Sequence, residues 1–171
     1  IVEYADWSIG KLISLASKEK WFTNTIFVFI ADHGAPLEAV YDIPLNYHHV
    51  PLIMYSPSFL KPQKFEHIGG QIDVFPTLMG ILNIPYINNT LGIDLINESR
   101  PYIYFTADDR IGVIDNEYFL IIKNDMSEGL YKYRSKDRTN YSKAESAKVN
   151  LMKDYAFSNL QTAQWMIDND K

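Results

Sequence analysis

Two continuous apolar runs and one amphipathic segment mark the first third of the chain. Residues 2–20 carry apolar side chains at steps of three and four, which predicts a helix with one face packed on other parts of the protein. Residues 25–31 show no polar alternation, which predicts a strand covered on both faces, as in the middle of a parallel sheet. A second buried strand is predicted over residues 50–55, and a short helix over residues 73–82.

The pattern changes after Arg100, where short strand-like runs alternate with turn residues. These runs predict a small antiparallel sheet, and residues 143–168 predict a closing helix. We therefore expect an α/β part over residues 1–98 and a small antiparallel β subdomain with a C-terminal helix over residues 99–171. The predicted strands of the sheet are residues 102–106, 111–115, 118–123 and 129–133.

Composition narrows the classes of function. The 171 residues carry a formal net charge of -5, which argues against a nucleic-acid-binding protein. The chain has no cysteine, so thiolate zinc sites, disulfides and cysteine nucleophiles are excluded. No apolar run reaches the roughly 18 residues needed to span a membrane. The first residue is Ile1 and no signal-peptide pattern precedes it, so we expect a piece of a longer protein.

The clearest chemical signal follows the first predicted strand, at Asp32-His33-Gly34. In α/β sheets, ligands bind beyond the carboxyl ends of the strands. A carboxylate beside an imidazole suits Mn²⁺ or Zn²⁺ better than Ca²⁺, which prefers oxygen ligands. An isolated Asp-His-Gly could equally be a turn former followed by an ordinary polar histidine.

Four segments in a fixed order favour the metal-site interpretation of Asp32-His33-Gly34 over the turn interpretation. Together they resemble the C-terminal half of sulfatase-family proteins in the alkaline phosphatase superfamily, and among these the bacterial lipoteichoic-acid-synthase-like phosphoglycerol transferases. The resemblance covers about residues 1–123. It implies the C-terminal part of an alkaline-phosphatase-like α/β/α sandwich, followed by the small antiparallel sheet and the C-terminal helix. The four segments are Tyr4–Gly10, Asn24–Gly34, Val50–Pro57 and Gln71–Leu78.

The resemblance also implies roles for individual residues. Asp32 and His33 fall where the family places two ligands of its catalytic metal. The family's nucleophile and remaining acidic ligands lie upstream of this motif, so neither is expected in this chain. His48 and His49 precede the second strand, where a residue facing the substrate is expected. His49 is the better candidate if strand alternation turns one imidazole inward, and the alternative is a solvent-exposed histidine pair.

Other polar residues have simpler interpretations. Asp6 and Asp73 recur in the family pattern, but both are predicted to cap the first turn of a helix. Residues 108–110 predict a charged turn, and His67 a surface residue. The tyrosines of the predicted sheet are expected to pack on it.

Three functions remain open from the sequence. The first is transfer or hydrolysis of phosphoglycerol-type esters through a covalent intermediate, with lipid-linked glycerol phosphate as a substrate. The resemblance then places the whole enzyme at the extracytoplasmic face of a bacterial membrane, with a membrane anchor upstream. The second is hydrolysis of sulfate esters, and the third is a non-catalytic binding module. In each case the chain by itself is expected to be inactive.

Overall fold

The computed structural model describes residues 2–35 and 39–169, which form two compact units. One unit lies within residues 1–35 and 46–64, and the other within residues 36–45 and 65–171. Among the described residues, no helix has both the length and the apolar character needed to cross a bilayer. The mixed α/β architecture, with small antiparallel sheets and a C-terminal helix, agrees with the predicted fold class. The division at residue 98 stays a prediction.

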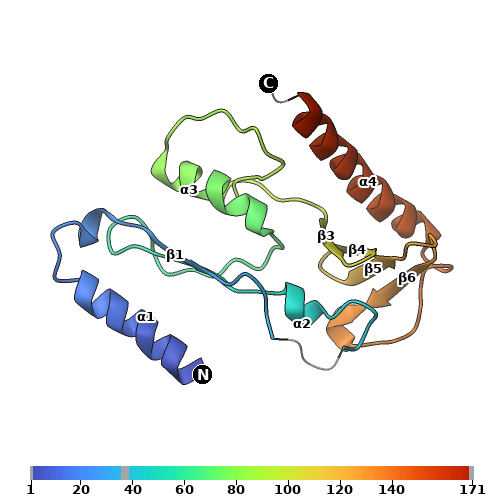
Figure 1. Ribbon diagram of the computed structural model, residues 1–171, viewed down its shortest axis with the longest axis horizontal. Coiled ribbons are helices and arrows are strands. Elements are labelled where there is room, and N and C mark those ends of the chain that lie inside the picture. Colours follow the sequence, from blue (N-terminus) through green and yellow to red (C-terminus); the bar gives the residue numbers. More distant parts are fainter. Residues whose placement is uncertain (1, 36–38, 170–171) are drawn as a thin grey trace. The chain divides into compact units, whose positions relative to one another are not determined.

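The first unit contains a two-stranded sheet whose strands run antiparallel (Figure 1). Phe27 pairs with Tyr55 at one end and Ile30 with Leu52 at the other. The predicted place in the middle of a parallel sheet is therefore wrong for the described residues. A continuous apolar run shows that a strand can be buried, but not which way its neighbour runs. The elements of this unit are α1 (Val2–Ala16), η1 (Phe22–Asn24), β1 (Phe27–Ile30) and β2 (Leu52–Tyr55), and α2 (Leu45–His48) leads back into it.

Burial in the first unit is also lower than the sequence predicts. The rings of Phe22, Phe27 and Tyr55 pack together, with centroids 5.7 to 6.3 Å apart. In β2, however, Ile53 remains 54% exposed. In α1 only Ala16 is buried, so the predicted apolar face of this helix is largely open. Periodicity identifies a face that can be buried, and burial itself depends on a partner element.

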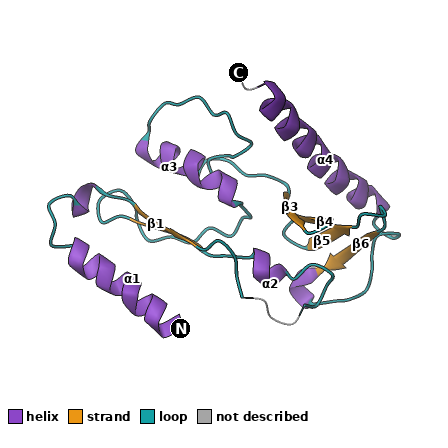
Figure 2. Ribbon diagram, in the orientation of Figure 1, coloured by secondary structure: helices purple, strands orange, loops and turns teal. Residues whose placement is uncertain are grey.

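The second unit contains a four-stranded antiparallel meander in the order β3-β4-β5-β6, followed by the long helix α4 (Figure 2). Each observed strand matches a predicted run to within about one residue, which confirms the predicted sheet. The predicted short helix and the closing helix are likewise confirmed. The elements are η2 (Gln71–Asp73), α3 (Val74–Leu82), β3 (Ile103–Ala107), β4 (Arg110–Ile114), β5 (Tyr118–Ile122), β6 (Glu128–Lys132), η3 (Tyr133–Ser135) and α4 (Ser146–Asn169).

The largest core surrounds β5, in which all five residues are buried. Leu120 belongs to the cluster that includes Val149 and Met152 of α4. Phe119 belongs to a second cluster with Ile43, from the segment before α2. Because successive side chains of a strand point to opposite faces, β5 is covered on both sides. The tyrosines of the sheet contribute to these clusters, as expected.

Asp73 is part of a buried network and not a simple helix cap. Its side chain is fully buried and makes no side-chain cap bond to α3. The carboxylate accepts hydrogen bonds from the backbone N–H groups of Gly70 and Ile93, at 2.8 and 2.9 Å, and forms an ion pair with Arg100. The bond from Gly70 belongs to a capping box of η2, which directly precedes α3, so the capping prediction is confirmed in part for Asp73. Asp6 lies within α1 and is exposed, so the capping prediction is wrong for that residue. Sequence position near a helix start does not reveal a partner 27 residues away.

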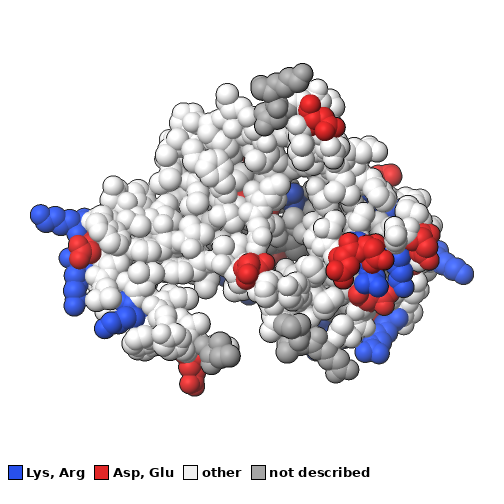
Figure 3. Space-filling view, viewed as in Figure 1, with Lys and Arg blue, Asp and Glu red and all other residues white. Residues whose placement is uncertain are grey.

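Several charged side chains on the surface of the second unit form ion pairs. Lys132 bonds to Glu117 and Lys153 bonds to Glu128, at 3.1 and 2.8 Å. Acidic and basic side chains are interspersed on the face shown in Figure 3. Exposed pairs of this kind contribute little stability, typically about 0 to 1 kcal/mol.

Candidate metal centre

The candidate centre lies directly after β1, where the chain turns at Asp32, His33 and Gly34. The Asp32 carboxylate accepts a hydrogen bond from the His33 backbone N–H at 2.9 Å. His33 Nδ1 lies 2.9 Å from the carbonyl oxygen of Gly34. A carbonyl oxygen only accepts, so Nδ1 carries a proton in this bond, and in the neutral imidazole the free lone pair is then on Nε2. This is the tautomer in which Nε2 can bind a metal.

The two candidate donor atoms are close enough to share one cation. His33 Nε2 lies 3.7 Å from Asp32 Oδ2. Bonds from nitrogen or carboxylate oxygen to Zn²⁺ are about 2.0 to 2.2 Å long, so two of them can span this separation. The side chains are 48% and 89% exposed, respectively, which leaves room for an ion and further ligands. No group of three or more His, Cys, Asp or Glu side chains in the described ranges could hold a metal, so these two residues fit only part of a coordination sphere.

A segment around α2 packs against the turn, and this close contact explains why position 34 is a glycine. The Gly34 N–H donates to the Tyr47 carbonyl at 2.7 Å, and the Asn46 amide donates to the Ala35 carbonyl at 3.0 Å. A Cβ at position 34 would lie 2.0 Å from the Asn46 carbonyl oxygen. The Tyr47 ring stacks on the His33 imidazole, with centroids 4.5 Å apart and planes 16° apart. Tyr47 is not among the residues that the sequence pattern indicated, although it directly precedes the predicted histidine pair.

The two histidines after Tyr47 differ in exposure. His48 is half-buried at the end of α2, and its ring meets the edge of Tyr47 at 5.4 Å. His49 is exposed. Strand alternation does not orient His49, because β2 begins only at Leu52. A contact of either histidine with substrate stays a prediction.

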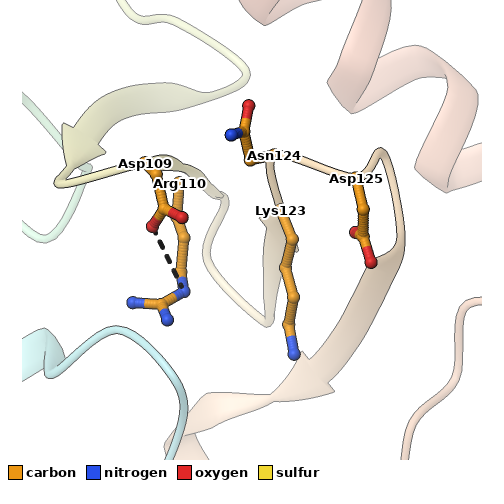
Figure 4. Close-up of a pocket in the computed structure, with 5 residues that line it drawn as sticks. All are labelled: Asp109, Arg110, Lys123, Asn124 and Asp125. Atoms are coloured by element: carbon orange, nitrogen blue, oxygen red, sulfur yellow. Dashed lines mark ion pairs between the residues drawn. The ribbon is translucent and has the colours of Figure 1, made fainter.

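A separate hollow of about 420 Å³ lies on the small sheet and contains none of the candidate ligands. The turn between β3 and β4 and the turn after β5 form it (Figure 4). The basic side chains here have acidic neighbours, since Lys123 bonds to Asp42 at 2.6 Å and Arg110 lies 4.0 Å from Asp109. The predicted charged turn is confirmed, since residues 108–109 form the turn between β3 and β4.

Residues 1–84, which include the candidate ligands, match the family model named Sulfatase. This part of the chain is therefore a segment of the sulfatase family. Sulfatases and members of the alkaline phosphatase superfamily generally depend on divalent metals, which agrees with the donor set of Asp32 and His33.

Two solved structures share the fold of this chain. An alkaline phosphatase superfamily protein from Vibrio parahaemolyticus superposes with a TM-score of 0.80 at 21% identity. The superposition covers 95% of this chain and 41% of that protein. BT4656, solved in complex with its substrate D-glucosamine-2-N,6-O-disulfate, superposes with a TM-score of 0.63 at 22% identity, over 99% of this chain and 40% of that one.

Curated relatives include several sulfatases and one protein of the predicted transferase type. Arylsulfatase K of Gallus gallus is 26% identical over 111 residues, covering 62% of this chain and 20% of the relative. The lipoteichoic acid synthase-like protein YvgJ of Bacillus subtilis is 27% identical over 116 residues, covering 58% and 19%. The matched part of the chain thus spans about a fifth of each of these superfamily members. The transferase-type relative was expected, but sulfatases are more numerous among the matches.

Proposed function

We propose that Asp32 and His33 are two ligands of a divalent cation in an enzyme that cleaves sulfate or phosphate esters. The observation that carries this proposal is the 3.7 Å pair of donor atoms, with the His33 tautomer held by Gly34, inside the segment that matches the sulfatase family. Mn²⁺ or Zn²⁺ suits this nitrogen and oxygen pair better than Ca²⁺.

The residues of this chain would bind and orient, while other groups complete the chemistry. A cation held here would stabilise negative charge on the attacking oxygen and on the transferring group. Asp32 contributes a negative charge to the site, and His33 contributes a neutral donor. We place the covalent nucleophile and the remaining acidic ligands outside these 171 residues. His48 and His49 are the proposed contacts to the substrate.

Two substrate classes remain in this proposal. Sulfate esters are supported by relatives such as the N-acetylgalactosamine-6-O-sulfatase of Bacteroides thetaiotaomicron, which is 26% identical over 136 residues. Phosphoglycerol-type esters, with lipid-linked glycerol phosphate as the donor, are supported by the resemblance to YvgJ. If phosphoglycerol-type esters are the substrate, we propose a membrane anchor upstream of this chain and an active site at the extracytoplasmic face of a bacterial membrane.

Turnover by the whole enzyme that contains this chain tests the proposal. Nitrophenyl sulfate and bis-nitrophenyl phosphate would be assayed with saturating Mn²⁺ or Zn²⁺. Asp32→Ala and His33→Ala should each reduce kcat/KM about 100-fold or more, by analogy with the loss of other charge-stabilising groups. Both side chains are well exposed, so the melting temperature should hardly change. Asp109→Ala, at an exposed turn of the small sheet, is the matched control and should leave turnover unchanged.

The preferred ester distinguishes the two substrate classes. Near-normal turnover by metal-replete His33→Ala enzyme would contradict the assignment of ligands. The 171-residue chain by itself should turn over neither ester. If it did, and Asp32→Ala abolished that activity, the nucleophile would have to lie within this chain.

A further inference from the structure

The stacking of Tyr47 on His33 joins two parts of the first unit that the sequence separates. The imidazole and phenol rings are nearly parallel, at 16°, and their centroids are 4.5 Å apart. Two further hydrogen bonds hold the same segments together: the Gly34 N–H donates to the Tyr47 carbonyl, and the Asn46 side-chain amide donates to the Ala35 carbonyl. The position of the Tyr47 backbone is thus secured independently of its ring.

We propose that Tyr47 is a positioning residue, whose ring holds the His33 imidazole so that Nε2 stands beside the Asp32 carboxylate. This inference rests on the proposed role of His33 as a metal ligand. It assigns to Tyr47 no contact with the metal or the substrate.

The need for such a residue follows from the exposure of His33. Its side chain is 48% exposed, so water can compete for the hydrogen bond from Nδ1 to the Gly34 carbonyl. Rotation about the side-chain torsions would then move Nε2 away from Asp32. A stacked ring opposes that rotation, because an aromatic pair contributes a preference equivalent to about two- to twelvefold in an equilibrium constant.

The ring of Tyr47 can be replaced without loss of the backbone hydrogen bond that Tyr47 accepts from Gly34. Tyr47 contributes its carbonyl oxygen to Gly34, and every substituted residue retains that oxygen. Tyr47→Phe keeps the stacking ring and serves as the matched control. Tyr47→Leu removes the aromatic ring while remaining compatible with the short helix α2.

Zn²⁺ titration of the whole enzyme that contains this chain, followed by NMR of the His33 ring protons, tests the inference. In the metal-free enzyme, Tyr47→Leu should shift these resonances, because the ring current of Tyr47 is lost. The apparent Zn²⁺ affinity at His33 should fall about two- to twelvefold. Tyr47→Phe should retain the wild-type affinity and ring-current shifts.

The outcomes separate this inference from the proposed function. If His33→Ala abolishes the Zn²⁺ response but Tyr47→Leu binds like wild type, the positioning role is overturned and the ligand role stands. If Zn²⁺ leaves the His33 resonances unchanged in the wild type, the proposed function is overturned together with the positioning role. Tyr47→Gln repeats the measurement with a second non-aromatic side chain, should amide shifts show that leucine disturbs α2.

Discussion

Replacement of Asp73 by alanine should destabilise the second unit by about 3 to 5 kcal/mol, the range for breaking a buried ion pair from one side. The Asp73 side chain is fully buried and that of Arg100 is 6% exposed. Truncation would leave the Arg100 guanidinium charged and buried, with its Nε already lacking a hydrogen-bond partner. The amides of Gly70 and Ile93 would also lose their acceptor, and each unsatisfied buried group costs about 1 to 3 kcal/mol before relaxation.

Urea unfolding followed by far-ultraviolet circular dichroism measures this loss, since α3 and α4 both belong to the second unit. Asp6→Ala is the matched control, because the sequence predicted the same capping role for an aspartate that is in fact exposed. Its effect should stay within about 0.5 kcal/mol. Arg100→Ala combined with Asp73→Ala should cost less than the sum of the single changes. A loss below about 1 kcal/mol for Asp73→Ala, as for a helix cap, would contradict a stabilising role of the buried ion pair.

Two further predictions concern acid stability and the turn at the candidate centre. Burial raises the pKa of Asp115, but hydrogen bonds from Lys148 and the hairpin backbone outweigh it and hold the pKa below its usual range. The stability that this carboxylate contributes is therefore present above about pH 4 and is lost as the pH falls through the folded-state pKa. The unfolding free energies of the wild type and of Asp115→Asn should thus differ at pH 7 and converge in acid. Gly34→Ala would place a methyl group 2.0 Å from the Asn46 carbonyl and should cost about 1 to 3 kcal/mol in thermal melts. Gly10→Ala, with no atom within 4 Å in a helix, should instead stabilise by up to about 1 kcal/mol, and equal melting of the two variants would contradict the steric argument.

Local patterns in the sequence were sufficient for the small sheet and the closing helix. The runs around β3 to β6 consist of strand-forming residues separated by turn formers such as Asp115, whose carboxylate accepts hydrogen bonds from the backbone N–H groups of Glu117 and Tyr118. Strand period, turn chemistry and helical period each depend on residues that are near one another in the chain. The Asp32-His33 pair was visible for the same reason, since both donors and the turn glycine are consecutive.

The packing partners of these elements became visible only in the tertiary structure. The apolar run of β1 did not reveal its antiparallel partner, and the stripe of α1 did not reveal that most of it is exposed among the described residues. The helix start near Asp73 indicated a cap, but not that Arg100, 27 residues later, is its ion-pair partner. Tyr47 became relevant only when α2 placed its ring on His33. The sequence by itself determined which segments form helices, strands and a potential ligand pair, because those properties are local. The partners that bury, neutralise or orient them come from distant parts of the chain, and only the fold brings them together.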